Sequence, residues 1–482
     1  MNRRLFIFCF FVFASTLLSS CSGVPGGGCT ANCGGGNANL SLVLTATPPA
    51  PGTGLSMEAF TATITGITLT PASGPAVNIP LNSSSYIAEF TRVTSDSTIL
   101  AAKVTVAAGT YTSAQINFSA PRVTFCTQSN PGVPGCAAGT LASVTGAAGS
   151  ATISTNITVS DSIQTGVALD VNIANALTLN GQTITAVNLG ATDVFSAATL
   201  PPASTATDLG AGQLSHVDDV LGTVTGVSGS TLTIHTTTRG DITATANSST
   251  QYDCSANNFS CVQANGVAIV DTVLNVDGTL TLTFYEPVDA TSADIIEGIV
   301  TGVPNSVTNQ FPIVVTDTVF ASSGSILSGR VNLGDQITVT LTPGQNFSII
   351  AKGLSLPIQS FTSSNSVASI LPGQTLAIPV SSFTAQSGVT PGTAGTTQIA
   401  LRFSRITGTM ATVALPFFSG SSFPSFYGFA TSQEFGTTAG RLSLDGVSSL
   451  TGISNGSTFS TSALYIGSPS SPQLVSQTVR AH

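Results

Sequence analysis

One segment of the chain has the spacing of a catalytic serine. Gly452 to Gly456 matches Gly-x-Ser-x-Gly, the nucleophile turn of serine hydrolases, with Ser454 at its centre. In those enzymes an acid and then a histidine follow the serine along the chain. No Asp or Glu follows Ser454, and the one later histidine is the terminal His482. In a chain with 48 glycines a chance match is expected, so we predict no catalytic residues and no enzymatic activity.

A second group could bind a divalent cation, because imidazole and carboxylate are common metal ligands. His216, Asp218 and Asp219 lie within four residues of one another. No further residue that could complete an active site lies near them in sequence, so we interpret the group as a solvated acidic start of a domain. We expect no metal and no other cofactor. A secreted enzyme would instead gather these side chains in a concave pocket. His235 alternates with threonines along a predicted strand and is expected at the surface.

The N-terminus has the features of an export signal that ends in a cysteine. Arg3 and Arg4 precede an apolar stretch at 5–18, and small residues then lead to Cys21. The stretch is shorter than the roughly 20 residues of a membrane-spanning helix. The segment Leu18-Ser19-Ser20-Cys21 resembles the lipobox of bacterial lipoproteins. The resemblance implies that Cys21 begins the mature chain and is acylated, and Ser22 after it implies transport to the outer membrane.

Six of the eight cysteines form close pairs in sequence: Cys29 with Cys33, Cys126 with Cys136, and Cys254 with Cys261. An exported chain meets an oxidising compartment, where disulfides form. A zinc site would need four ligands, and no pair has a histidine or a second cysteine pair nearby. We therefore predict three local disulfides, although the Gly-rich surroundings of Cys29 and Cys33 fix no geometry for theirs.

Charge is scarce and negative. Only 7% of the 482 residues are charged, and removing Arg3 and Arg4 leaves 10 basic against 21 acidic residues. A nucleic-acid partner would need clustered Lys and Arg, and the lysines are Lys103 and Lys352 alone. We expect no nucleic acid, and attachment to the membrane through the acyl group rather than through charge.

Alternating apolar and hydroxyl-bearing residues indicate an all-β fold with an N-terminal sandwich. Phe60, Ala62 and Ile64 alternate with threonines, and Gly66 shifts the phase, which predicts a β-bulge. Further strands are predicted at 86–93, 100–106, 110–118, 151–159, 167–173 and 183–189. The predicted divisions are a signal peptide at 1–20, a Gly-rich tether at 21–39, the sandwich at 40–199 and a linker at 200–215, then β-barrel repeats at 216–290 and 291–380 and a degenerate β domain at 381–482.

The division into barrels rests on an internal repeat. Gly222-Thr-Val-Thr-Gly-Val and Gly298-Ile-Val-Thr-Gly-Val agree at five of six positions. The segments 371–376 and 405–408 indicate a third, decayed copy, which makes two or three small barrels. Asp277-Gly278 between two strand-like runs predicts a hairpin.

These segments also resemble known families. Val106–Tyr111 and Gly166–Val171 resemble an uncharacterised sandwich domain of bacterial lipoproteins with an immunoglobulin- or transthyretin-like fold. Gly222–Val227, Ile242–Thr250 and Asn275–Thr283 resemble a second uncharacterised family of repeated OB-like barrels. The resemblance implies architecture and a place in the cell envelope, and no reaction.

One aromatic-rich stretch is the remaining candidate site. Its members are Phe417, Phe418, Phe423, Phe426, Tyr427, Phe429 and Phe435. An exposed patch of this kind would bind a glycan or a partner protein, whereas core packing of the last domain would also explain it. We expect a non-catalytic binding or structural protein of the envelope, with a carbohydrate-binding or adhesion protein and a secreted enzyme as alternatives.

Overall fold

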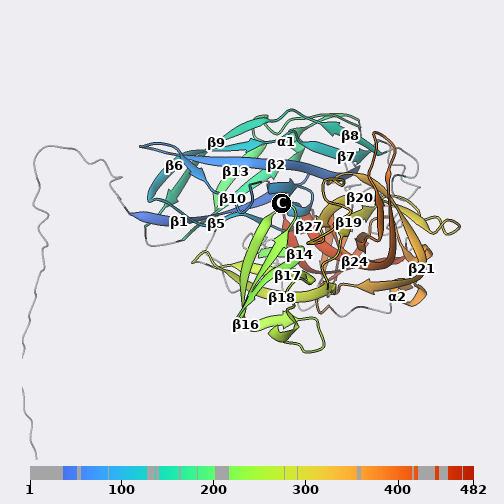
Figure 1. Cartoon of the computed structure of the whole chain (residues 1–482). Helices are drawn as coiled ribbons and strands as arrows, with labels where there is room; N and C mark the ends of the chain where they lie inside the picture. The colour runs from blue at the N-terminus through green and yellow to red at the C-terminus, as the bar shows by residue number, and fades with distance from the viewer. Residues whose placement is uncertain are drawn as a thin grey trace, which may run out of the picture.

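The computed structural model describes residues 36–50, 56–84, 86–127, 136, 141–161, 164–181, 183–200, 216–275, 277–289, 291–354, 356, 360–414, 417–421, 440–444, 454–468 and 471–482. The protein is all-β, as predicted, and its sheets form a sandwich and a series of strand rings (Figure 1). The helical segments are single short turns: η1 (Arg92–Thr94), α1 (Ile173–Ala176), η2 (Phe259–Cys261), α2 (Ser360–Ser364) and η3 (Val367–Ser369). Within these ranges no helix is long and apolar enough to cross a membrane.

The N-terminal unit is a two-sheet sandwich. One sheet has the order β13-β10-β1-β5: Phe195–Thr199, Thr165–Asn172, Asn37–Thr47 and Thr98–Ala107. The other has the order β8-β7-β2-β6-β9: Leu141–Thr145, Arg122–Cys126, Ser56–Pro71, Gly109–Phe118 and Gly149–Val159. β3 (Val77–Ile79) and β4 (Tyr86–Glu89) pair with β2, and β11 (Leu177–Asn180) pairs with β12 (Thr183–Val187). The apolar inner faces of both sheets form one core between them.

Two local predictions in this unit have different outcomes. The register of β2 against β6 shifts between Ile64 and Gly66, so the predicted bulge is confirmed. The strand predicted at 86–93 is wrong in its second half, because β4 ends at Glu89 and η1 follows it. The Glu89 carboxylate accepts hydrogen bonds from the backbone N–H groups of Phe60 and Arg92, 2.8 Å each, and these bonds stabilise the turn.

The second unit is a closed five-stranded barrel. Its strand order around the ring is β14-β15-β16-β18-β17: His216–Ser228, Thr231–Thr236, Gly240–Tyr252, Leu280–Asp289 and Val267–Leu274. β16 and β18 pair in parallel and every other neighbour is antiparallel, an arrangement of the OB type. The hairpin predicted at Asp277-Gly278 joins β17 to β18, with the Asn275 N–H donating to the Thr279 carbonyl at 2.8 Å.

The same strand order recurs in a second ring of five strands. β19 pairs with β20, β20 with β21, β21 in parallel with β24, β24 with β22, and β22 with β19. Their bounds are Ile295–Val300, Gln310–Val319, Gln336–Ile349, Gly392–Ala414 and Thr375–Pro379, and β23 (Ser382–Thr384) pairs with β24. The boundary predicted at residue 380 lies between β22 and β24, which pair with each other in this ring.

A third ring shares β24 with the second. The second half of β24 pairs with β25 and β27, β25 with β26, β26 in parallel with β28, and β28 with β27. The new strands are Phe417–Ser421, Gly440–Leu444, Thr458–Ser468 and Ser471–Ala481. Because β24 spans 23 residues, it serves as the last strand of one ring and the first strand of the next.

The units pack against each other through apolar faces. Val43, Ile99 and Ala168, from the sheet β13-β10-β1-β5, belong to the core of the first barrel. Leu221 and Ile269 of that barrel pack with Ile295, Ala377 and Ala400 of the second ring. In Figure 1 the sandwich therefore lies across the top, with the first barrel below it and the later rings beside it.

Two of the three predicted disulfides lie within the described residues, and both are confirmed. Cys126 is bonded to Cys136 and Cys254 to Cys261, with Cα–Cα distances of 5.5 and 6.4 Å. Cys29 and Cys33, and the lipidation candidate Cys21, lie outside the described residues.

Candidate functional site

Ten charged side chains meet where the sandwich, the first barrel and the later rings converge. All ten are buried, and we call them the ionic core. Its acidic members are Asp96, Asp219, Asp271, Glu297 and Asp317, and its basic members are Arg92, Arg239, Lys352, Arg402 and Arg405. Half of the ten basic residues that follow the signal peptide are thus buried in one cluster.

Different units supply the members of the ionic core. The sandwich contributes Arg92 from η1 and Asp96 from the segment that follows it. The first barrel contributes Asp219 and Asp271 from β14 and β17, and Arg239 from the β15–β16 turn. The remaining members come from the second ring and from β24: Glu297 on β19, Asp317 on β20, Lys352 after β21, and Arg402 and Arg405.

Two members are held in an unusual backbone conformation. Asp219 has φ +62° and Lys352 has φ +50°, in the left-handed region that side chains other than glycine seldom adopt. Asp219 lies where the register of β14 against β17 shifts between Val217 and Val220. This bulge allows both carboxylates of the Asp218-Asp219 pair to face the interior of the molecule, instead of alternating as they would in a regular strand.

Asp219 is the centre of the network. Its carboxylate lies 2.7 Å from the Arg405 guanidinium, 3.2 Å from that of Arg402, and 3.3 Å from Lys352 Nζ. Arg92 also donates a hydrogen bond to the Asp219 carbonyl oxygen. Burial alone would favour the neutral acid, but these cations, Arg402 first, hold the pKa of Asp219 well below its usual range.

A second node joins the sandwich to the second ring. The Arg92 guanidinium lies 3.1 Å from Glu297 and 3.0 Å from Asp317. Arg239 also contacts Asp317, at 3.0 Å, and Arg402 Nε lies 2.7 Å from Glu297. Burial disfavours the charge on Glu297, yet Arg402 and Arg92 outweigh it and lower the pKa of this carboxyl. Three of the five cations, Arg92, Arg402 and Arg405, therefore bridge carboxylates of different units.

Lys352 sits between the two barrel carboxylates. Its Nζ donates to Asp271 Oδ1 at 2.7 Å and lies 5.0 Å from the centre of the Phe403 ring. Asp271 Oδ1 also accepts the Asp219 backbone N–H at 2.6 Å. Burial opposes the ammonium charge, but Asp219 and Asp271 raise the pKa of Lys352, so the lysine remains a cation.

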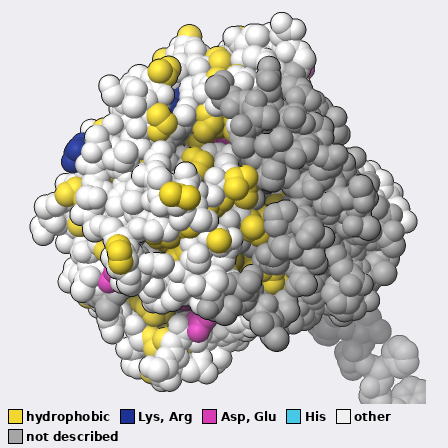
Figure 2. Space-filling view, turned by 90° about the vertical axis from the view of Figure 1, so that its right-hand side faces the viewer, with side chains coloured by type: hydrophobic (Ala, Val, Ile, Leu, Met, Phe, Trp, Pro, Cys, Tyr) yellow, Lys and Arg dark blue, Asp and Glu magenta, His cyan; other side chains and the backbone are white. Residues whose placement is uncertain are grey.

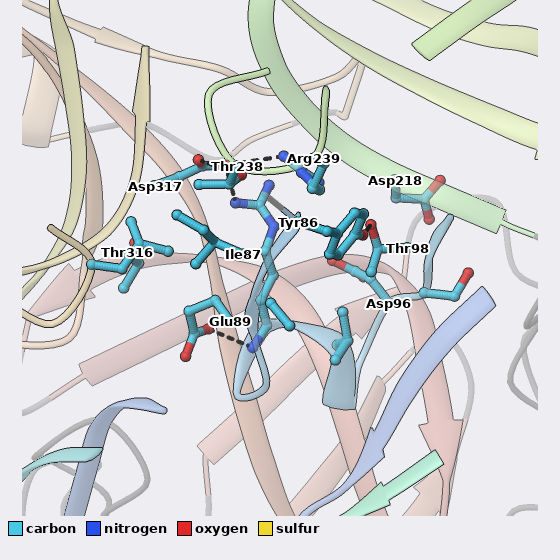
Figure 3. A pocket seen from close by; sticks show the side chains of 15 residues that line it. Tyr86, Ile87, Glu89, Asp96, Thr98, Asp218, Thr238, Arg239, Thr316 and Asp317 are labelled. Atoms are coloured by element: carbon cyan, nitrogen blue, oxygen red, sulfur yellow. Dashed lines mark hydrogen bonds and ion pairs between the residues drawn. The ribbon is translucent and has the colours of Figure 1, made fainter. Parts of the chain in front are cut away.

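A small cavity opens beside the ionic core (Figure 3). Among the residues that line it are Tyr86, Asp96, Thr98, Asp218, Arg239 and Asp317. Its volume of about 20 Å³ holds roughly one water molecule. The polar groups converge as an active-site pocket would require, but the space is far below the ~300 Å³ typical of small-molecule sites.

The prediction of a solvated acidic group near 216 is wrong for Asp219, whereas Asp218 is half-buried. Asp219 is 1% exposed and Asp218 lines the cavity, while the side chain of His216 lies outside the described residues. Asp271, on β17, is also buried. The cause is tertiary: Arg402 and Arg405, the cations that attract Asp219, come from β24, and Arg405 is 186 residues away.

Other predicted residues lie apart from the ionic core. Ser454 is exposed, and its Oγ lies 3.1 Å from that of Ser457. His235 is exposed as predicted, 2.6 Å from Asp241. In the described parts of the chain, no three His, Cys, Asp or Glu side chains are placed to hold a metal ion. The carboxylates of the ionic core face guanidinium and ammonium groups instead.

The aromatic stretch cannot be placed as a surface. Phe417 and Phe418 belong to β25, but their side chains are not among those described. The others lie outside the described residues: Phe423, Phe426, Tyr427, Phe429 and Phe435.

Neither a protein-family model nor a curated protein matches this chain. Buried ion pairs are costly to desolvate and add little net stability, but removing one partner is strongly destabilising. The arrangement fits a device that fixes how the β units are assembled.

Proposed function

We propose that this protein is a lipid-anchored component of the bacterial cell envelope, at the outer membrane, with a non-catalytic binding or structural role. The observation that carries the proposal is the segment Leu18-Ser19-Ser20-Cys21 after an apolar stretch of signal-peptide length. An acyl chain on Cys21 would supply the membrane attachment, since the exposed basic residues among the described side chains, Lys103 and Arg330, offer little attraction for anionic lipid.

The non-catalytic part of the proposal rests on how the polar groups are used. The carboxylates of the ionic core are paired with cations, and the space beside them holds about one water molecule. On the face in Figure 2, charged side chains are few and isolated among uncharged ones. Such a surface favours an uncharged or weakly charged partner, and we propose another envelope protein or a glycan.

Acylation at Cys21 can be tested in a bacterial host with a labelled fatty acid. The wild-type chain and Cys9→Ala should incorporate the label and partition with membranes, because Cys9 lies inside the apolar stretch of the signal. Cys21→Ala should incorporate none. Label in Cys21→Ala, or an unprocessed Met1 in the wild-type protein, would overturn the proposal.

The partner can be sought with the mature chain that begins at Ser22. Binding on a glycan array, or one envelope protein recovered at constant stoichiometry, would identify its class. Hydrolysis of an ester or glycoside that Ser454→Ala abolishes would contradict a non-catalytic role.

A further inference from the structure

A sixth carboxylate lies beside the ionic core without a cation of its own. The ionic core holds five acidic and five basic side chains, and each acidic one lies within 3.0 Å of at least one cation. Asp218 takes part in none of the ion pairs among the described residues. Its ionisation would leave the junction with one uncompensated negative charge.

Carboxylates of two units lie around Asp218. Three carboxylates face it: Asp271 on β17, Asp219 next to it on β14, and Asp96 from the sandwich. Lys352 is the cation that acts on it most strongly, and it is already bonded to Asp271 at 2.7 Å and lies 3.3 Å from Asp219. Arg92 and Arg239 line the same cavity, but each is bonded to Asp317 at 3.0 Å. Burial, and then these carboxylates, raise the pKa of Asp218 well above its usual range.

Asp96 differs from Asp218 in one contact. Burial raises the pKa of Asp96 as well, but Arg405 lies 2.7 Å away and opposes that effect. Figure 3 shows both side chains on the same side of the cavity, near Thr98. The cavity next to Asp218 gives a neutral carboxyl group room for about one hydrogen-bonded water.

We propose that Asp218 carries a proton in the folded protein and acts as an alkali-sensitive latch where the sandwich meets the first barrel. With the proton in place, Asp218 adds no charge to the ionic core, whose members are five acidic and five basic side chains. Loss of the proton adds a negative charge among three carboxylates and weakens the contact between the two units.

The sign of the pH dependence follows from proton binding. Above pH ~4 an unfolded chain has lost the Asp218 proton, whereas the folded chain keeps it. The folded state then binds one proton more, so each unit rise in pH multiplies the unfolding equilibrium constant by about ten through this residue. The dependence ends where the folded protein itself releases the proton.

The test is the slope of stability against pH in the full mature chain. Equilibrium unfolding of the wild-type protein and Asp218→Asn is compared from pH 7 to 9, where the side chain of Asn is neutral throughout. In the wild-type protein, the unfolding equilibrium constant should rise by up to tenfold more per pH unit than in Asp218→Asn. Equal slopes in the two proteins would overturn the proposal.

Two controls separate Asp218 from its neighbours. Glu286→Gln removes a carboxyl on β18 whose pKa is raised to about 8, chiefly by burial, so its own contribution to the slope is measured directly. Asp96→Asn removes one of the two carboxylates bonded to Arg405 and should weaken the protein at every pH, with little change in slope. The same loss of slope in Asp96→Asn as in Asp218→Asn would assign the proton to the pair rather than to Asp218, which overturns the proposal.

Infrared spectra make the test independent of refolding. The folded wild-type protein at pH 7 should show the carbonyl band of a buried protonated carboxyl that Asp218→Asn lacks. If sodium rather than a proton balances Asp218, wild-type stability at pH 7 will rise in sodium chloride over choline chloride at equal ionic strength. Absence of the band, or that sodium dependence, rejects the proposal.

Discussion

Arg402 illustrates how a single residue in this protein gains importance from burial. Its side chain has no exposed surface and contacts both Asp219 and Glu297, at 3.2 and 2.7 Å. Neither carboxylate could be buried ionised without a cation at this distance. Because Arg402 touches the two nodes of the ionic core, it links the first barrel to the second ring through one guanidinium.

Replacing Arg402 should therefore cost far more than replacing a surface arginine. Arg402→Met leaves two buried carboxylates short of a partner, and we expect a loss of about 3–5 kcal/mol in the free energy of unfolding. Arg330→Met is the matched control, since Arg330 is exposed, and should cost less than ~1 kcal/mol. Denaturant unfolding of both variants measures these losses. Equal losses in free energy would contradict the role of Arg402 as the cation that both carboxylates need.

At the scale of elements, the repeated Gly-x-Val-Thr-Gly-Val segment has a physical explanation. Its first copy lies within β14, the first strand of the first barrel, and its second copy begins in β19, the first strand of the second ring. A Cβ atom at Gly222 would lie 2.4 Å from the His235 carbonyl oxygen, and one at Gly298 would lie 2.8 Å from that of Val314. The first glycine of each copy is thus required by the close approach of the next strand.

The two glycines of one copy should respond differently to a methyl group. Gly222→Ala forces β14 and β15 apart, and we expect a loss of about 2 kcal/mol or more, as for other overpacked sites. Gly226→Ala meets only ordinary contacts with Thr233, the nearest at 3.5 Å. It should change stability by less than ~1 kcal/mol.

Thermal unfolding of the two variants measures this difference. Equal melting temperatures would show that the first glycine of the repeat is not set by close packing. The comparison is well matched, because both glycines lie in the same strand four residues apart and receive the same substitution.

At the scale of the whole molecule, the described β units interlock through ion pairs and a shared strand. The ion pairs of Arg92 join the sandwich to β19 and β20, and the second and third rings share β24. At the C-terminus, Arg480 donates to the Val93 carbonyl oxygen of the sandwich at 3.3 Å. Contacts between distant parts of the chain are thus present at every boundary between units.

This connectivity predicts cooperative unfolding. In the wild-type protein, hydrogen exchange in β2 and in β16 should report the same opening free energy, because the sandwich cannot separate from the first barrel without exposing the ionic core. Arg92→Met removes the cation that spans Glu297 and Asp317, and the sandwich should then open at lower denaturant than the barrels. Lys103→Met, an exposed change on β5, should keep a single transition.

Separate opening of β2 and β16 in the wild-type protein would contradict this prediction. So would an Arg92→Met variant that retains one transition at the wild-type midpoint. Exchange measured by mass spectrometry on peptides from the two strands distinguishes these outcomes.

The sequence by itself determined the local features. Alternation with a period of two predicts strands, a phase shift at Gly66 predicts the bulge, and Asp277-Gly278 predicts the hairpin, because each depends on neighbouring residues. The disulfides at Cys126 and Cys254 are likewise local, since their partners lie ten and seven residues away.

Only the tertiary structure decided which charges are buried. In sequence, Asp218 and Asp219 look like a solvated acidic pair, and Arg92 looks like part of a strand. The contact between Arg92 and Asp317 spans 225 residues, and no local pattern encodes a contact at that separation. The electrostatic free energy of a carboxylate depends on the cations within a few ångströms of it, and here the packing of separate β units supplies those cations.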